Sequence, residues 1–394
     1  MINFFRCNRC LFPNTKPDLH FDQKGICGAC NYTSYYENEI NWKQKEEEFA
    51  ILCQDIKSNS NNQAKSNYYD CVIAVSGGKD SSYQVYLAKK FGLNPLLFSF
   101  EPSYQTEVGI KNLSNLRNTF ECDLIQLKKN LTVYKKLAKI GFEVVGDHEW
   151  PNHVGIYTWP IKMAIRMNIN LILYGEPQGL IGQGRTKKLK DIESIDREWF
   201  EQYVGLVGLR PKDMMEFDKS LDEKNMHPYI FPEDIKFKEK NITPIFTGNY
   251  FKWDWHEVIK KMENYGWLRS PDRTEGDYEN IEDTDCGFQT IHQYFKFIKY
   301  GYARATDHAS YEIRHGRLNK KQAKELIITY DHEMPKKYFK EFLLFLEISE
   351  EKFFEIRDKF TNRELFKTEN NLELKKSDDN KLILEDIWYE SFDT

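Results

Sequence analysis

The segment CVIAVSGGKDSS, residues 71–82, combines two glycines, a lysine, an aspartate and three serines. Its first five residues are typical of a buried strand, and the residues from Asp80 onward are typical of a helix. Backbone N–H groups at the start of a helix form an anion site, which the helix dipole reinforces. The segment therefore predicts a loop that binds phosphate groups.

The residue types of this loop suit nucleotide chemistry. Gly77 and Gly78 let the backbone approach a phosphate closely, and Lys79 can neutralise its charge. The carboxylate of Asp80 can hold Mg²⁺, because hard cations prefer oxygen ligands. The candidate ATP-binding residues are Ser76, Gly77, Gly78, Lys79, Asp80, Ser81 and Ser82.

The loop is too compact for the Walker pattern GxxxxGK[ST]. SGGKDSS instead resembles the PP-loop of the ATP pyrophosphatase superfamily. The resemblance implies that ATP adenylates a substrate oxygen with release of pyrophosphate, after which a nitrogen or sulfur nucleophile displaces AMP. Lys79 and Asp80 are then the expected catalytic residues, with magnesium at Asp80. The alternative is a glycine turn with a capping aspartate.

Four of the eight cysteines follow the spacing Cys7-x2-Cys10-x16-Cys27-x2-Cys30. Two such CxxC pairs are typical of a tetrahedral zinc site, and four thiolates leave no position open for water. The pattern predicts a structural zinc site, the alternatives being redox pairs or free thiols. The other cysteines are expected to be buried as small apolar residues; they are Cys53, Cys71, Cys122 and Cys286.

Apolar strand-like runs alternate with helical patterns from residue 68 onward. Strands are expected at 71–75, 95–100, 123–127 and 171–175, and helices at 80–92, 106–120, 132–142 and 157–167. This order indicates an α/β fold in which helices cover both faces of a parallel sheet. Ligands bind beyond the carboxyl ends of such strands. Glu176 directly follows the last of these strands, so it is a candidate to orient magnesium or ammonia, the alternative being a turn carboxylate.

The remaining segments are less regular. A polar helix is expected at 37–56 and an irregular linker at 58–67. Past residue 190 the strand signal fades, and residues 190–285 are rich in aromatic residues and loop signals that assign no element. Helices dominate from 289, and the last twenty or so residues look like a frayed tail. The predicted domains are a zinc module (1–35), a helix and linker (36–67), an ATP-binding α/β domain (68–190), an aromatic-rich and then helical substrate or partner region (191–365) and a tail (366–394).

Other polar residues are weaker candidates. His148 lies in the run GDHEWPNH with Asp147, Glu149 and His153, and it is the candidate general acid or base, or else a structural histidine. Three arginines near the C-terminal helices could bind a carboxylate or a diphosphate, since guanidinium forks match those oxygens; they are Arg304, Arg314 and Arg317. The alternative for the arginines is a solvated helix face.

Five segments together resemble the N-acetyl sugar amidotransferase family of bacterial O-antigen, lipopolysaccharide and pseudaminic-acid-type sugar biosynthesis. They are RCNRCLFPNTKPDLHFDQKGICGAC, AVSGGKDSS, HEWPNHVGIYTWP, LILYGEP and the run from Asp285 to Ala323. The resemblance implies that ATP activates the acetamido oxygen of a sugar as an O-adenylated imidate. Ammonia would then displace AMP, giving an acetamidino sugar.

Ammonia is expected from a separate glutaminase subunit. None of the cysteines lies in a GxCxG elbow, and Cys7 belongs to the zinc pattern. The family resemblance implies a partner like the glutaminase of histidine biosynthesis, with a cyclase-like companion.

The formal net charge of −5 gives no basic face for coating nucleic acid, so no nucleic-acid partner is expected. The N-terminus has no signal-peptide pattern and no apolar run is long enough to span a membrane, which predicts a soluble cytoplasmic protein. Two alternatives remain: a PP-loop tRNA-modifying enzyme, by thiolation or lysidine-type ligation, and a non-catalytic zinc adaptor that kept an ATP loop.

Overall fold

A five-stranded parallel sheet forms the centre of the computed structural model, which describes residues 3–62, 68–175, 208–233, 239–370 and 373–393. The strand order is β3-β2-β1-β4-β5, and every neighbouring pair is parallel. The strands are β1 (Cys71–Ala74), β2 (Pro95–Phe100), β3 (Leu124–Leu127), β4 (Leu171–Tyr174) and β5 (Thr243–Phe246). The expected α/β fold class is confirmed.

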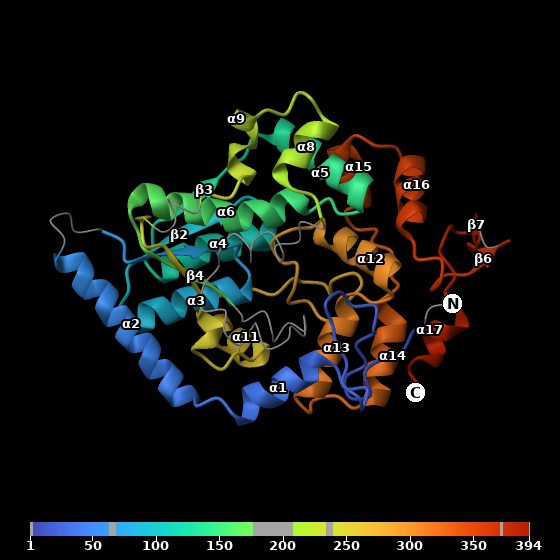
Figure 1. Cartoon of the computed structure of the whole chain (residues 1–394), viewed down its shortest axis with the longest axis horizontal. Helices are drawn as coiled ribbons and strands as arrows, with labels where there is room; N and C mark the ends of the chain where they lie inside the picture. The colour runs from blue at the N-terminus through green and yellow to red at the C-terminus, as the bar shows by residue number, and fades with distance from the viewer. Residues whose placement is uncertain (1–2, 63–67, 176–207, 234–238, 371–372, 394) are drawn as a thin grey trace.

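Strands β1, β2 and β4 are buried and largely apolar because both faces of the sheet are covered at its centre. Val72 and Ile172 point into one buried cluster, whereas Ile73 and Leu173 point into another. The first face carries α5 (Leu131–Val145), α6 (Trp150–Met167) and α12 (Gln289–Tyr300). The second carries α3 (Lys79–Lys90), α4 (Glu107–Thr119) and α11 (Trp255–Glu263). Figure 1 shows α6 above the strands and α3 and α11 below them.

The expected helix over 37–56 is wrong in its bounds. Two helices, α1 (Gly28–Asn38) and α2 (Trp42–Asn62), meet at a break, where the Asn41 side chain accepts a hydrogen bond from Gln44 N at 3.2 Å. Helix α2 continues through 58–62, which had been expected to be irregular; residues 63–67 lie outside the described part of the chain. The polar stretch stays helical because the helix is anchored by the buried Phe49, whose ring meets that of Phe91 at 5.2 Å.

A further strand lies in the region 190–285, to which the sequence assigned no element. The segment TPIF forms β5 beside β4, with Ile245 opposite Leu173. The strand has four residues and includes Pro244, which is tolerated at a sheet edge. Short helices occur in the same stretch of the sequence: α8 (Pro211–Phe217), α9 (Glu223–Met226), η3 (His227–Tyr229) and η4 (Thr247–Asn249).

The C-terminal region is helical as expected, but its helices are shorter than the helical patterns in the sequence. Gly301, with φ of 73°, ends α12, and α13 (Arg304–Arg314) then begins. The helices α14 (Lys320–Tyr330), α15 (Phe339–Leu346) and α16 (Glu350–Phe360) follow.

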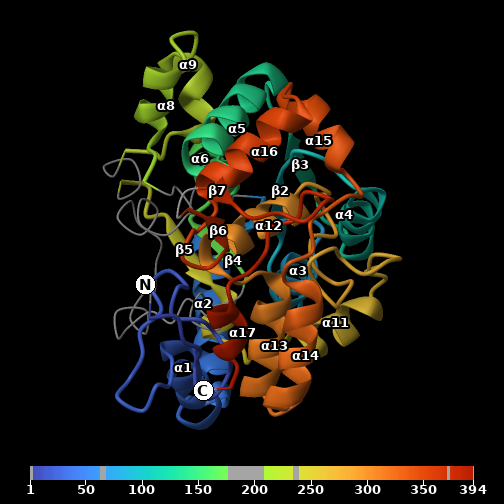
Figure 2. The same ribbon diagram turned by 90° about the vertical axis from the view of Figure 1, so that its right-hand side faces the viewer.

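The last segment is not frayed. It forms a small hairpin, β6 (Thr368–Glu369) with β7 (Glu373–Leu374), and the helix α17 (Asp386–Glu390), which lies near α14 in both views (Figures 1 and 2). Leu384, Trp388 and Phe392 are buried, and the Trp388 indole donates to Gly301 O at 2.7 Å. Trp388 lies in α17, and Leu384 and Phe392 flank the helix on either side.

Candidate active site and cysteine cluster

The SGGKDSS loop joins the end of β1 to the start of α3. Gly77 has φ of 93°, and a Cβ atom there would lie 2.9 Å from Gly109 O, so this position requires glycine. The Trp267 indole donates to Gly77 O at 3.1 Å. The loop is therefore held in one conformation from outside, by α4 and by the segment after α11.

The hydroxyl groups of the loop are engaged with its own backbone. Ser81 and Ser82 donate to Gly78 O at 3.0 and 2.9 Å, and Gly78 N donates to Ser76 Oγ at 3.2 Å. These bonds shape the turn that presents the helix N-terminus. Contact of the two serines with phosphate stays a prediction.

Lys79 is buried between two carboxylates. Its ammonium group pairs with Asp80 at 2.8 Å and with Glu282 from a distant loop. Burial alone would lower the pKa of Lys79, but Asp80 and Glu282 together raise it above the usual range. The other oxygen of Asp80 accepts a hydrogen bond from Trp253 Nε1 at 3.0 Å. Lys79 is thus charged and its position is set before any phosphate binds.

An acidic segment, Glu282 to Asp285, faces the loop, and the sequence interpretation did not select it. Burial raises the pKa of Asp285 to about 6, and burial also raises the pKa of Asp283. Arg304 Nη2 lies 3.4 Å from Asp283 Oδ1. The run E-D-T-D in a region without strand or helix signals was the available clue.

A cavity of about 540 Å³ opens at the carboxyl ends of the strands. Ala74, Phe100 and Tyr174 line it from β1, β2 and β4, as expected for this fold. Its remaining walls come from the loop, the acidic segment, α6, α12 and Arg304. The volume lies within the usual range for ligand pockets, roughly 300–1,000 Å³. Glu176 lies outside the described residues.

The three candidate arginines have different surroundings. Arg304 lines this large cavity and also a smaller one of about 120 Å³, which Arg314 lines as well. Arg317 lines neither: it binds Asp254 and Glu312, each at 2.7 Å. The geometry therefore favours Arg304 and Arg314 over Arg317 as ligand-binding residues.

His148 does not reach either cavity. Its buried ring packs near Phe142, Phe288 and Phe342, and its Nε2 lies 3.2 Å from Glu149 Oε1. A role for His148 as acid or base stays a prediction that this position does not favour. Two other histidines, His153 on α6 and His292 on α12, line the large cavity instead.

The four predicted zinc ligands come together in one buried cluster. Cys7 Sγ lies 3.8 Å from Cys30 Sγ, and Cys10 Sγ lies 3.5 Å from Cys27 Sγ. A tetrahedral ion with Zn–S bonds of about 2.3 Å places sulfur atoms about 3.8 Å apart. Cys7 Sγ also accepts hydrogen bonds from two backbone N–H groups, those of Arg9 and Cys27, which favours a thiolate. The cluster could hold zinc.

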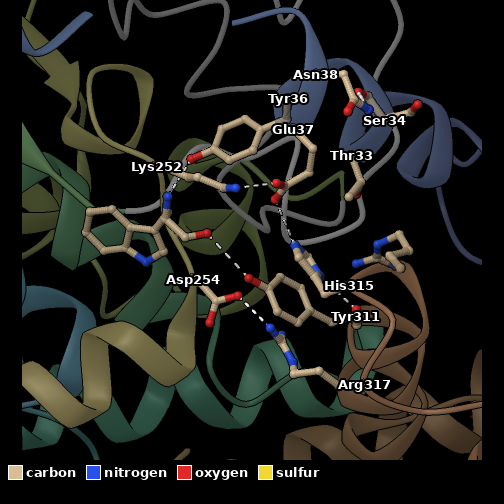
Figure 3. A network of polar contacts seen from close by, with 12 residues as sticks. Thr33, Ser34, Tyr36, Glu37, Asn38, Lys252, Asp254, Tyr311, His315 and Arg317 are labelled. Atoms are coloured by element: carbon tan, nitrogen blue, oxygen red, sulfur yellow. Dashed lines mark hydrogen bonds and ion pairs between the residues drawn. The ribbon is translucent and has the colours of Figure 1, made fainter. Parts of the chain in front are cut away.

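The cysteine module packs against α13, which carries Arg304 and Arg314. Thr15 Oγ1 donates to Tyr300 O, and Lys16 pairs with Asp307 at 3.4 Å. Helix α1 also contacts this region, as Figure 3 shows. Its Glu37 lies 3.6 Å from Nε2 of His315, the residue that follows α13, and it also pairs with Lys252. The module therefore supports one wall of the smaller cavity.

Residues 260–378 match the family model described as "LPS biosynthesis protein WbpG-like, C-terminal domain". This part of the chain is similar to the WbpG-like C-terminal domain. It includes the acidic segment, α12 and α13, and so supplies His292 and Arg304 to the large cavity. The match supports the resemblance found in the sequence.

Two further comparisons are less informative. An uncharacterized protein of Methanocaldococcus jannaschii is 30% identical over 129 residues, 32% of this chain and 44% of the relative, so the chain spans less than half of that protein. The NH3-dependent NAD synthetase of Campylobacter jejuni aligns with 60% of this chain and 100% of its own at 11% identity, with a TM-score of 0.29. A likeness this weak adds nothing to the sheet order given above. None of the described helices is long and apolar enough to cross a membrane.

Proposed function

We propose that the protein is an AMP-forming amidotransferase that converts the acetamido group of a bacterial sugar into an acetamidino group. The observation that supports this most is the SGGKDSS loop, which opens into a 540 Å³ cavity whose far wall belongs to a WbpG-like domain. The cavity has room beyond the loop for a second substrate. The sugar acetamido oxygen attacks the α-phosphorus of ATP, and ammonia then displaces AMP.

The polar groups of the cavity suit this chemistry. Lys79 and the N-terminus of α3 stabilise the negative charge that develops on the phosphates. Asp80 is the proposed magnesium ligand, and Mg²⁺ would neutralise the leaving pyrophosphate. Arg304 is placed to bind an acidic group of the sugar or a diphosphate attached to it. Zinc in the cysteine cluster has a structural role.

Ammonia comes from a separate glutaminase in this proposal. All eight cysteines are buried, and burial raises the pKa of Cys286, which lines no part of the 540 Å³ cavity, to about 12. A thiol in that state is a poor nucleophile. A glutaminase subunit with a cyclase-like companion is the proposed partner, and the cytoplasm is the proposed location because it supplies ATP and keeps zinc-binding thiols reduced.

The test combines purified protein, Mg-ATP, ammonium salt and a panel of N-acetylated sugars that includes acidic and nucleotide-linked ones. AMP and pyrophosphate are expected with one sugar, whose mass should fall by the difference between O and NH. Reactions without sugar, and a Lys79→Met variant, serve as controls. AMP formation with tRNA instead of any sugar would contradict the proposal and support the tRNA-modifying alternative.

A further inference from the structure

The wall of the large cavity formed by α6 and α12 holds a histidine–aspartate pair. His292 Nδ1 lies 2.9 Å from Asp147 Oδ1, although the two residues are 145 positions apart in the sequence. Asp147 is buried, whereas 22% of the His292 side chain is exposed and it lines the cavity. The carboxylate thus lies behind the imidazole, which faces the space where a substrate would bind.

The surroundings of Asp147 keep it ionised and oriented. Burial opposes ionisation, but His292, His153 and Lys299 hold the pKa of Asp147 below its usual range. Glu149 N donates to Asp147 Oδ1 at 3.0 Å. An ionised Asp147 accepts the Nδ1 proton of His292, so the neutral imidazole keeps its lone pair on Nε2.

The second histidine at this wall does not form the same pair. His153 Nδ1 lies 4.0 Å from the other oxygen of Asp147, beyond hydrogen-bond distance, and burial lowers the pKa of His153. Its ring meets that of His292 edge-on at 5.3 Å. His153 therefore helps to hold the His292 ring in place without competing for the Asp147 oxygen that orients it.

We propose that His292 is the general base of the amination step and that Asp147 is its positioning residue. This inference rests on the proposed function. The lone pair of ammonia forms the new C–N bond to the N-protonated, O-adenylated imidate, while the C=N π pair moves to the sugar nitrogen, and the added nitrogen becomes positively charged. One proton passes from that nitrogen to Nε2 of His292. The C–O bond then breaks with its electron pair, AMP leaves as its anion, and the C=N bond forms again to give the amidinium group.

A base is needed at this step for a chemical reason. While the new nitrogen keeps all three protons, it can leave again as neutral ammonia, whereas after it loses one proton only AMP remains as a good leaving group. The adenylation step has no such requirement, because an amide oxygen attacks without first losing a proton. His292 should therefore affect the second half-reaction and spare the first.

The experiment separates the two half-reactions in His292→Ala and Asp147→Asn. Sugar-dependent ATP–pyrophosphate exchange without ammonium reports adenylation, and amidine formation with ammonium reports the whole reaction. We expect the rate of ATP–pyrophosphate exchange in both variants to stay within about twofold of the wild-type rate. The reason is that His292 acts only after adenylation is complete. Amidine formation should fall by about 10²- to 10⁴-fold in His292→Ala and by about 10- to 100-fold in Asp147→Asn.

Imidazole in the buffer should restore part of the amidine formation in His292→Ala, which a merely structural defect would not allow. His256→Ala is the matched control: this exposed histidine also pairs with a carboxylate, Glu312 at 3.1 Å, but lines neither cavity. Equal loss of both half-reactions, or undiminished amidine formation in His292→Ala, would overturn the proposal. A wild-type protein that shows no exchange with any sugar would refute the proposed function itself.

Discussion

The two ends of the large cavity are built in different ways. The loop end consists of seven consecutive residues, Ser76 to Ser82, whose hydroxyl groups bond to their own backbone. The helical end brings Asp147, from the segment between α5 and α6, to His292 on α12, 145 positions away. A contiguous motif binds a common cofactor, whereas an assembled wall can be adapted to one acceptor and one nucleophile.

This difference divides the proposed reaction. The loop end handles the phosphates of ATP, so changes there should abolish both half-reactions. The helical end handles the acceptor, so changes there should affect amination more than adenylation. The predictions below alter one end at a time.

The largest effect is expected from Lys79→Met at the loop end. Sugar-dependent exchange and amidine formation should both fall by at least about 10³-fold, because the phosphates lose their buried counter-charge. Lys90→Met is the matched control, since Lys90 lies on the same helix but is exposed and pairs with Glu46 at 2.7 Å. If Lys79→Met lost amidine formation but kept exchange, the loop end would not be needed for adenylation, and the proposed division between the two ends would be wrong.

Cys10→Ser tests the module that supports the smaller cavity beside the loop. Losing one zinc ligand should release the metal and lower the free energy of unfolding by an amount on the order of 5 kcal/mol, because zinc binding is coupled to folding. Zinc content and urea unfolding measure this. Cys122→Ser is the control and should keep the metal, because Cys122 is not one of the four clustered cysteines. A serine there can also donate the hydrogen bond that Cys122 Sγ makes to Phe120 O at 3.3 Å. Equal zinc content in both variants would contradict the assignment.

Trp388→Ala perturbs the helical end of the cavity indirectly, through α12. The indole packs edge-on against Phe297 of α12 and donates to Gly301 O, so its removal should cost about 3–5 kcal/mol of unfolding free energy. Under conditions in which the variant is still folded, the rate of amidine formation should decline more than the rate of exchange, because α12 also carries His292. Tyr389→Ala, at a largely exposed neighbour, should leave both rates unchanged. A larger loss of exchange would show that the tail supports the loop end instead.

Local signals explain what the sequence predicted well. The glycines and charges of the loop and the CxxC pairs each lie within a few residues, and strands β1, β2 and β4 are largely apolar runs. The Lys79–Glu282 and Asp147–His292 pairs join segments that only the folded sheet brings together, so no spacing rule reveals them. His148 was selected as a candidate acid or base in a run that includes two carboxylates, yet its ring packs among phenylalanines.

The smallest expected effect distinguishes the two ends by pH. His308 lies 2.9 Å from Asp277 and 3.7 Å from Glu282, the partner of Lys79 at the loop end. Burial opposes its charge, but these carboxylates raise the pKa of His308 to about 10. Because the folded-state pKa exceeds the ordinary value of 6.5, the stabilisation is complete below pH 6.5 and is lost as the pH rises toward 10.

The helical end should respond in the opposite direction. The pKa of Asp147 lies below its ordinary value of 3.8, so its contribution is present above that pH and is lost in acid. In urea unfolding, His308→Asn should remove the decline of the unfolding free energy at alkaline pH. This decline should be on the order of 2 kcal/mol, since Arg304 and Lys79 stay beside the same carboxylates and keep them partly compensated. Asp147→Asn should remove only the acid decline. An alkaline decline that persists in His308→Asn would show that another group carries it, and the loop end would then lack the pH response that separates it from the helical end.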